Sequence, residues 1–395
     1  MHLIFGAFLL LFLGFSCQTP HPQDKKLTHS KPIDAKNGNP IKSNTVLVPV
    51  TTEHLVSDAY YRFEGQVGSR GAVAILFIGN TEVSGRYFYE RNGRPIELSG
   101  QRMKNDSVYL QEYCIGNETS GTLEGLIHND GVFSGNWVSE DRSRKTPFVF
   151  HRRKVSGLTT QVMVYNQEMG VDAKERSKGH DKGTAKANSQ FRASILTLNT
   201  STPSIGKKIN AIMASKLDAM IKAEMMMGDD FSSLWQAVKQ SKKGEGLDAD
   251  ELVINSYVSY MDEHIICLGI SYWQNAADFA HPWDSSQEFI FDLKTGTLIT
   301  LESLLKSEGK KSLNMIGQKA IQKLFNHPAI EGKDFELTDN FTVNPYGLLF
   351  VYRRGEIGGS FADVPFDVFI PYSDLKQLLK SETILSNYLK NLKNA

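Results

Sequence analysis

The sequence has few cysteines and no net charge, and both features narrow the classes of protein that it can encode. Lysine plus arginine total 44 in 395 residues, and aspartate plus glutamate also total 44. This balance gives no global attraction to nucleic acid, so we expect no nucleic-acid partner. The cysteines are Cys17, Cys114 and Cys267. Because Cys114 and Cys267 lie in apolar strand patterns, we interpret them as buried free thiols.

The sequence also lacks the motifs of common hydrolases and metal sites. It has no G-x-S-x-G nucleophile elbow, and its histidines form no pair with HExxH or HxxxH spacing. Asp248-Ala249-Asp250-Glu251 could hold a cation, although short acidic loops are usually only solvated. Glu112, Glu118 and Glu124 could act in glycoside chemistry, although isolated exposed charges are far commoner. We therefore expect a protein without catalytic residues, metal ions or cofactors.

A long apolar run stands at the start of the chain, at Leu3–Phe15. It has the length of a signal-peptide core and is too short for a comfortable membrane span. The following Ser16-Cys17 resembles a bacterial lipobox, although Phe15 is bulky and the first residues include no Lys or Arg. We predict a signal peptide over residues 1–16 and a lipid anchor on Cys17. A standard signal peptide with an incidental cysteine is the alternative.

The residues after Cys17 predict where the protein is held. Gln18 replaces the Asp that retains many lipoproteins in the inner membrane, so we expect the outer membrane, on either its periplasmic or its surface face. Residues 17–55 are rich in Pro, Lys, Asn, Ser and Thr and show no periodic pattern, which predicts a flexible tether. No later apolar run reaches 18 residues, so we expect no membrane-spanning helix in the mature chain.

Residues 56–154 show short strands separated by turn residues, which predicts an all-β domain. Asn92-Gly93 is the strongest turn signal, because both residues tolerate positive φ. The expected strands are Tyr60–Val67, Ala72–Ile78, Val83–Glu90, Pro95–Met103, Ser107–Cys114, Thr119–Asn129, Val132–Ser139 and Pro147–Arg153. Eight consecutive antiparallel strands bring the first beside the last, and closure removes both free edges. We predict an eight-stranded antiparallel up-and-down barrel, with an open meander as the alternative.

The interior of such a barrel is either filled by side chains or holds one small ligand. The many aromatic residues of this region favour filling, and a stacking platform for a sugar or lipid chain is the alternative. Glycines recur inside the expected strands, at Gly65, Gly85, Gly100, Gly121, Gly125 and Gly135. Strand glycines mark tight bends or close approach of neighbouring backbones, as the corners of a barrel require.

From residue 155 the pattern changes to strands that alternate with helices, which predicts an α+β fold. Residues 155–275 are expected to form a half-domain with a charged, Gly-rich mobile loop over residues 172–188. Its expected strands are Thr159–Asn166, Phe191–Leu198, Leu252–Tyr260 and Ile265–Trp273, and a further strand is expected after it at Gln287–Leu293. The expected helices are Gly206–Met227, Phe231–Lys242, Lys311–Asn326 and Asp374–Lys380, the last with Ser373 as its cap, and an amphipathic stretch follows at Ile384–Leu392.

Ordered sequence blocks in residues 276–395 carry a family resemblance. They are Ala280-His281-Pro282-Trp283, then residues 289–296 and 301–305, then Asn344–Phe350 with Glu356-Ile357-Gly358, and finally Ile370–Leu375. This region resembles the domain of unknown function at the extracellular C-terminus of the lysozyme-sensing anti-sigma factor RsiV. The same domain accompanies the peptidoglycan deacetylase PdaC. The resemblance implies an α+β domain, and the residues from Thr159 to Tyr272 look like the half-domain that usually precedes it.

The resemblance also implies a binding role outside the cytoplasm, since the RsiV-type ectodomain binds lysozyme. We expect neither a sigma-binding segment nor a deacetylase domain in this chain. Our leading hypothesis is a non-catalytic envelope lipoprotein that binds a lysozyme-like protein, peptidoglycan or another glycan. A carrier of a small apolar ligand or lipid in the barrel is one alternative. An envelope hydrolase with an unrecognised site is the other.

Two segments and the barrel mouth are the candidate contact surfaces for that ligand. The turn Ala280–Asp284 supplies an imidazole, an indole and a carboxylate, and the loop Arg353–Phe361 combines charge with glycines and one aromatic ring. The candidate ligand-binding residues are His281, Trp283, Asp284, Arg353, Arg354, Glu356 and Phe361. An ordinary hairpin turn and an ordinary connecting loop are the respective alternatives.

Overall fold

The computed structural model describes residues 55–90, 92–113, 119–170, 188–224, 251–275, 283–325, 336–353, 356 and 366–391. The predicted signal peptide, Cys17, the tether up to residue 54 and Cys114 lie outside these residues. So do the predicted loop up to residue 187, the helix Phe231–Lys242 and Asp248–Asp250. Within the described ranges, no helix has both the length and the apolar character needed to cross a bilayer.

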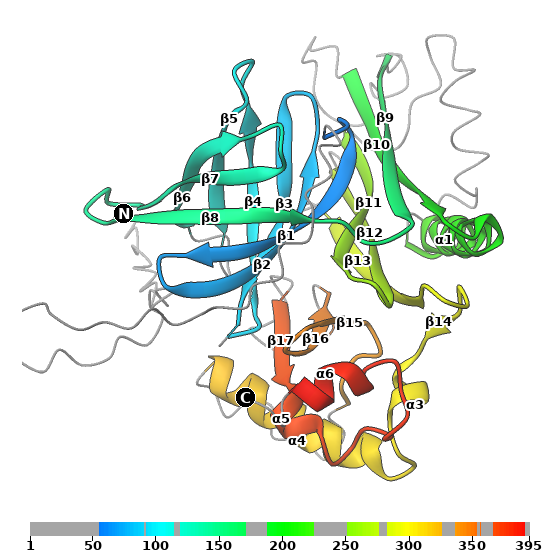
Figure 1. The fold of residues 1–395 in the computed structure, drawn as a ribbon. Coiled ribbons are helices and arrows are strands. Elements are labelled where there is room, and N and C mark those ends of the chain that lie inside the picture. The colour runs from blue at the N-terminus through cyan, green and yellow to red at the C-terminus, as the bar shows by residue number, and fades with distance from the viewer. Residues whose placement is uncertain are drawn as a thin grey trace, which may run out of the picture.

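The first eight strands form a closed antiparallel barrel, in which β1 pairs with both β2 and β8 (Figure 1). The strands are β1 (Ala59–Val67), β2 (Arg70–Ile78), β3 (Glu82–Tyr89), β4 (Pro95–Arg102), β5 (Ser107–Tyr113), β6 (Thr119–Ile127), β7 (Val132–Ser139) and β8 (Lys145–Arg153). The predicted eight-stranded barrel is therefore confirmed, and the open meander is excluded.

The glycines inside the strands allow close backbone approach at the places where the barrel wall bends. At Gly85 of β3, φ is +146°, and an added Cβ would lie 2.1 Å from the carbonyl oxygen of Ile75. At Gly100 of β4, an added Cβ would lie 1.8 Å from the carbonyl oxygen of Tyr109. No side chain fits these positions, which agrees with the predicted role of strand glycines.

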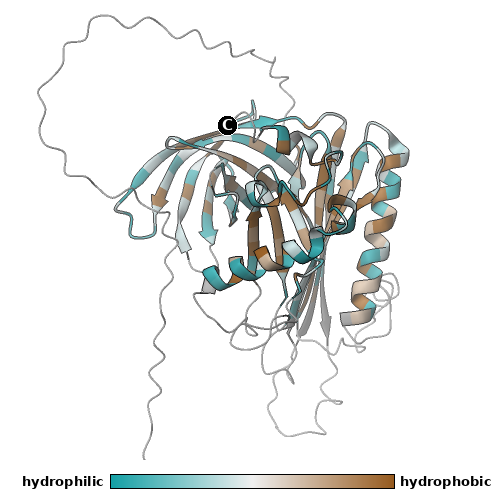
Figure 2. Ribbon diagram, turned by 90° about the horizontal axis from the view of Figure 1, so that it is seen from below, coloured by the Kyte–Doolittle hydropathy of each residue, from teal (hydrophilic) through white to brown (hydrophobic). Residues whose placement is uncertain are grey.

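The inward side chains of the barrel form one buried apolar cluster. Three of its aromatic rings come together on β7 and β8, where the Phe133 and Phe148 centroids are 4.8 Å apart and Phe150 adjoins both. The buried members are Ala59, Tyr61, Phe63, Val67, Ala72, Ala74, Leu76, Ile78, Val83, Tyr87, Leu98, Val108, Leu110, Leu123, Ile127, Phe133, Phe148 and Phe150. Figure 2 shows hydrophilic and hydrophobic residues alternating along the barrel strands. This packing favours a filled interior.

Strand β2 is apolar on both of its faces, because it lies between two cores. Ala74 and Leu76 point into the barrel, whereas Val73, Ile75 and Phe77 belong to the core of the second domain. Side chains alternate between the faces of a strand, so a continuous apolar run is what a strand buried on both sides requires. The barrel wall thereby packs directly against the rest of the protein.

The second domain combines a six-stranded sheet, a three-stranded sheet and several helices (Figure 1). The larger sheet has the order β14-β13-β12-β11-β10-β9, and its β10–β11 pair is parallel. Its strands are β9 (Leu158–Gly170), β10 (Asn188–Thr200), β11 (Glu251–Met261), β12 (Ile265–Asn275), β13 (Trp283–Asp292) and β14 (Leu298–Ile299). The smaller sheet consists of β15 (Phe341–Asn344), β16 (Gly347–Tyr352) and β17 (Phe366–Pro371). The described helices are α1 (Pro203–Glu224), α3 (Leu301–Leu304), α4 (Gly309–Phe325), α5 (Tyr372–Leu375) and α6 (Ser386–Asn391).

This mixture confirms the predicted α+β class, but two local features differ from the sequence expectation. The strands of the small sheet were not among the expected strands. The predicted helix over Asp374–Lys380 is wrong, because α5 already begins at Tyr372 and ends at Leu375. Ser373 therefore lies inside the helix, and its hydroxyl donates to Asp374 instead of capping the helix. The predicted boundaries at residues 154 and 275 stay predictions, and the six-stranded sheet continues across residue 275.

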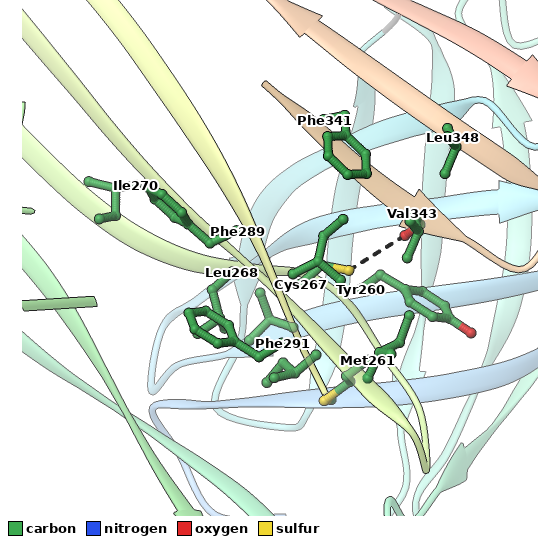
Figure 3. Close-up of a cluster of buried hydrophobic side chains, with 14 of the residues drawn as sticks. Tyr260, Met261, Cys267, Leu268, Ile270, Phe289, Phe291, Phe341, Val343 and Leu348 are labelled. Atoms are coloured by element: carbon green, nitrogen blue, oxygen red, sulfur yellow. Dashed lines mark hydrogen bonds between the residues drawn. The ribbon is translucent and has the colours of Figure 1, made fainter. Parts of the chain in front are cut away.

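Cys267 on β12 lies between the two sheets, surrounded by apolar side chains (Figure 3). Its side chain is fully buried, and its Sγ lies 3.7 Å from the carbonyl oxygen of Val343 on β15. Burial in this apolar setting raises the pKa of the thiol to about 12. The prediction of a buried free thiol is therefore confirmed for Cys267.

Candidate functional site

A pocket of about 200 Å³ lies where β11, β12 and β13 come close to the end of β16. Its lining is polar and aromatic, which contrasts with the apolar core around Cys267. The lining residues are Asn255, Ser271, Tyr272, Trp273, Asp284, Ser285, Ser286 and Arg353.

The strand register explains how these side chains come together. Ser271 on β12 pairs with Asn255 on β11 and with Ser286 on β13, so these three form one cross-strand row. Trp273 pairs with Asp284 in the row two residues further along. Because residues two apart share a face, both rows lie on the same side of the sheet. An indole ring and a carboxylate therefore stand next to three small polar side chains.

Arg353 reaches the pocket because Asn340 connects β13 to β16. The Asn340 side-chain amide donates to the carbonyl oxygens of Ser286, at 2.9 Å, and Val351, at 3.0 Å. Arg353 follows the last residue of β16, and its backbone N–H donates to a carboxylate oxygen of Glu356 at 2.9 Å. The backbone N–H of Glu356 donates back to the Arg353 carbonyl oxygen at 3.2 Å. This turn holds the start of the loop beside the pocket.

Ser285 supplies a polar group that the described protein does not satisfy. The residue is 6% exposed, and its hydroxyl has no hydrogen-bond partner among the described residues. Buried polar groups are nearly always hydrogen-bonded, and each exception calls for an explanation. Because Ser285 lies between Asp284 and Ser286 on β13, its side chain points to the face of the sheet opposite theirs, so this hydroxyl gives no support to a ligand in the pocket.

The pocket brings together two of the residues that the sequence proposed, Asp284 and Arg353, and Glu356 contacts the backbone of the latter. Trp283 is the first residue of β13 and pairs with Gln274. The remaining candidates His281, Arg354 and Phe361 lie outside the described residues.

Sequence reasoning missed Trp273 and the row of Asn255, Ser271 and Ser286. Small polar residues at alternate positions of otherwise apolar strands are the signal that could have pointed to them. Strand pairing, which a single sequence does not reveal, is needed to place the three in one row.

Of the glutamates considered for glycoside chemistry, Glu118 lies outside the described residues, and Glu112 and Glu124 lie on opposite faces of the barrel wall. Glu112 is buried in the barrel, where it accepts hydrogen bonds from the Tyr87 hydroxyl and, at 2.7 Å, from Ser120. Glu124 lies on the outer face of the barrel, in a 3.3 Å ion pair with Arg142. The expectation of exposed charges was wrong for Glu112, because its carboxylate has partners inside the barrel. Across the described ranges, no three His, Cys, Asp or Glu side chains gather as metal ligands would.

The fold is thus a closed eight-stranded barrel joined to an α+β domain, and part of that domain belongs to a known family. Residues 291–373 match the family described as "Protein of unknown function (DUF3298)". The C-terminal region therefore contains a DUF3298 domain. The matched residues include Arg353 and end before α6, whereas Asp284 precedes them.

Two solved structures of DUF3298 proteins resemble this chain. A family member from Bacteroides fragilis NCTC 9343 is 15% identical, with a TM-score of 0.45, and the match covers 60% of this chain and 99% of that one. A DUF3298 family protein from Pseudomonas aeruginosa PAO1 is 12% identical, with a TM-score of 0.42, and the match covers 57% of this chain and 96% of that one. No curated protein sequence matches the chain.

Proposed function

We propose that this protein is a non-catalytic binding protein of the bacterial cell envelope that holds one sugar unit of a peptidoglycan-type glycan in the pocket between Trp273 and Arg353. The observation that carries the proposal is the pocket itself, which groups an indole ring, a carboxylate, an arginine and small hydroxyl and amide side chains. Ligand sites combine a contact surface for the ligand body with a few polar groups that fix its orientation. A sugar presents both an apolar ring face and several hydroxyls.

The size of the pocket supports a single unit of a longer chain. At about 200 Å³ it is smaller than the roughly 300–1,000 Å³ typical of sites that enclose a whole small molecule. A polymer could place one ring in the pocket while its neighbours lie on the surrounding surface.

Binding without hydrolysis fits the acid groups of the pocket. Most glycoside hydrolases use two carboxyl groups that flank the scissile bond. Asp284 is the sole carboxyl group in the described lining of the pocket. A second carboxylate would have to come from outside these residues, so we assign the site a binding role.

The envelope location rests on the sequence. The apolar run Leu3–Phe15 followed by Cys17 is typical of a lipoprotein signal, and a lipid on Cys17 would tether the domains to the outer membrane. The resemblance to a domain that accompanies a peptidoglycan deacetylase favours a ligand in the cell wall. The resemblance to RsiV favours a second candidate, in which the same region binds a lysozyme-like protein.

Binding to purified peptidoglycan sacculi tests the proposal. The full chain is expected to sediment with sacculi in a saturable way, and titration with a disaccharide–peptide fragment should show binding at one site per chain. Trp273→Ala should weaken this binding at least about tenfold, because aromatic contacts supply much of the binding energy in such sites. Tyr109→Ala is the matched control, since Tyr109 is 44% exposed on the outer wall of the barrel and does not line the pocket.

The outcomes separate the candidates. Equal losses in Trp273→Ala and Tyr109→Ala would place binding away from the pocket. Saturable binding to lysozyme without binding to sacculi would favour the second candidate. No binding to either would remove both proposals.

A further inference from the structure

A second pocket, of about 190 Å³, lies between helix α1 and the six-stranded sheet, and we call it the α1 pocket. Its lining is mostly apolar, and it shares no lining residue with the pocket proposed for the glycan. The residues that line it are Ile195, Leu196 and Thr197 on β10, Asn210, Met213, Ala214, Leu217 and Asp218 on α1, Ser256 on β11, and Leu268 and Ile270 on β12.

The α1 pocket forms where β10 leaves its neighbour β11 partway along its length. The two strands are paired from Gln190 to Ser194, and β10 then continues to Thr200 paired with β9 but not with β11. A side chain takes over the hydrogen bonds that β11 no longer supplies. Ser256 Oγ accepts from the Leu196 N–H at 2.6 Å and donates to the Ser194 carbonyl oxygen at 3.1 Å.

Asn210 on α1 satisfies the same edge of β10 further along. Its Oδ1 accepts from the Leu198 N–H and its Nδ2 donates to the Leu198 carbonyl oxygen, both at 3.0 Å. Buried backbone groups need hydrogen-bond partners, and a strand that leaves its neighbour would otherwise lose them. Because Ser256 and Asn210 supply these partners, the gap between β10 and β11 is a stable feature of the fold.

The same hydrogen bonds determine which groups are left to contact a ligand. The Thr197 hydroxyl also has a partner, since it donates to the Gln161 carbonyl oxygen on β9 at 3.3 Å. The hydroxyl and amide groups of the lining are therefore engaged within the protein. The remaining contact surface comes mainly from aliphatic side chains, such as the buried Leu217, Leu268 and Ile270. Apolar contact has no preferred direction, so such a site selects its ligand by size and shape.

The shape of the α1 pocket favours a chain over a ring. Along α1 its lining runs from Asn210 to Asp218, which corresponds to about 12 Å of helix. A volume of about 190 Å³ spread over that length is narrow. Apolar cavities of about 150 Å³ already take up small hydrocarbons in other proteins, so the volume is sufficient for a hydrocarbon ligand.

We propose that the α1 pocket binds the unbranched hydrocarbon chain of a single-chain amphiphile, with the chain between α1 and β10 and the head group at the solvent-exposed edge beside Ala214. This site is separate from the glycan pocket and does not depend on it. It also differs from a lipid carrier that uses the barrel, because the barrel interior is filled by side chains.

Isothermal titration calorimetry of the full chain with decanol tests the proposal. The uncharged head group of decanol keeps the charge of Asp218 out of the measurement. Decanol is expected to bind saturably at one site per chain, with a negative heat-capacity change, because the contact buries apolar surface. Adamantanol, a compact cage with the same number of carbon atoms, should bind at least about tenfold more weakly, since it would strain a narrow pocket.

Variants of α1 locate the binding site. Ala214→Leu places a larger side chain in the pocket and should weaken decanol binding at least about tenfold. Ala219→Leu is the matched control, because Ala219 is also exposed on α1 but does not line the pocket. Met213→Ala removes a buried side chain from the lining and should move the preference from decanol to the longer dodecanol. A loss of stability alone would not change the preferred chain length.

The proposal is overturned if decanol shows no saturable binding, or if adamantanol binds as tightly as decanol. It is equally overturned if Ala214→Leu and Ala219→Leu bind decanol alike, or if Met213→Ala keeps the preference for decanol. None of these outcomes bears on the glycan pocket, because binding to sacculi and its dependence on Trp273 are measured separately.

Discussion

Replacing Ile75 by alanine removes a fully buried side chain that the barrel wall presents to the second domain. Ile75 pairs with Arg62 on β1 and with Arg86 on β3, so two arginines flank it on the outer face. Arg62 donates from Nη1 to the Tyr260 hydroxyl at 2.8 Å and to the Met261 carbonyl oxygen at 2.7 Å. The isoleucine therefore fills the space between two cation contacts that join the domains.

The cost of Ile75→Ala follows from the lost apolar contacts and the cavity that remains. Truncations of this kind in protein cores cost about 2–5 kcal/mol. We expect a value in the upper half of that range, about 4 kcal/mol, because rigid strands from two domains enclose the site and cannot easily close over it. Leu76→Ala is the matched control, since Leu76 is the next residue, is also fully buried and points into the barrel.

Chemical denaturation combined with hydrogen exchange distinguishes the two variants. Both should lower the free energy of unfolding, but only Ile75→Ala should speed exchange in β11, which carries Tyr260 and Met261. Leu76→Ala should speed exchange mainly within the barrel. A loss below about 1 kcal/mol for Ile75→Ala, or identical exchange maps for the two variants, would refute a tightly packed interface between the domains.

Two further predictions concern backbone fit and buried hydroxyls. Gly93→Ala should destabilise the protein by at least about 2 kcal/mol in thermal unfolding, because φ is +59° and the added Cβ would lie 2.1 Å from the Phe369 ring. At Gly131, where φ is +82°, an added Cβ would contact only an arginine side chain, so Gly131→Ala should cost about half as much. Equal costs would contradict close packing of the β3–β4 hairpin tip against Phe369. Ser259→Ala should cost about 1–3 kcal/mol in chemical denaturation, because it removes a donor from buried Glu288. Ser285→Ala should change stability by less than about 0.5 kcal/mol, since its hydroxyl lacks a partner among the described residues, and a large loss would reveal one.

The barrel could be predicted from the sequence because its signals are local. Turn residues such as Asn92-Gly93 separate strands whose alternation is visible within nine residues, and consecutive pairing then fixes the topology. The apolar run of β2 predicted a strand. The core against which its outer face packs is formed by residues more than 100 positions away, such as Tyr260, and could not be predicted.

The small sheet and the polar pocket could not be predicted from the sequence, because their residues are identified by partners that lie far away along the chain. β15 has four buried residues and β16 has six, and such short apolar runs carry no distinctive period. Asp284 and Arg353 were proposed from local composition, whereas Trp273 enters the pocket through strand pairing. Arg86 on β3 contacts Glu97 on β4 and the ring of Tyr257 on β11, so these contacts join both domains. The local sequence around any one of these residues does not predict the other two.

The two-sided burial of β2 bears on how the chain can be divided. A fragment that ends after β8 would keep all strand pairs of the closed barrel. However, Val73, Ile75 and Phe77 would then form an exposed apolar stripe on its outer surface. Contiguous apolar surface of that sort promotes self-association. We therefore expect the barrel alone to be poorly soluble, and a fragment designed for expression should retain the six-stranded sheet that covers this stripe.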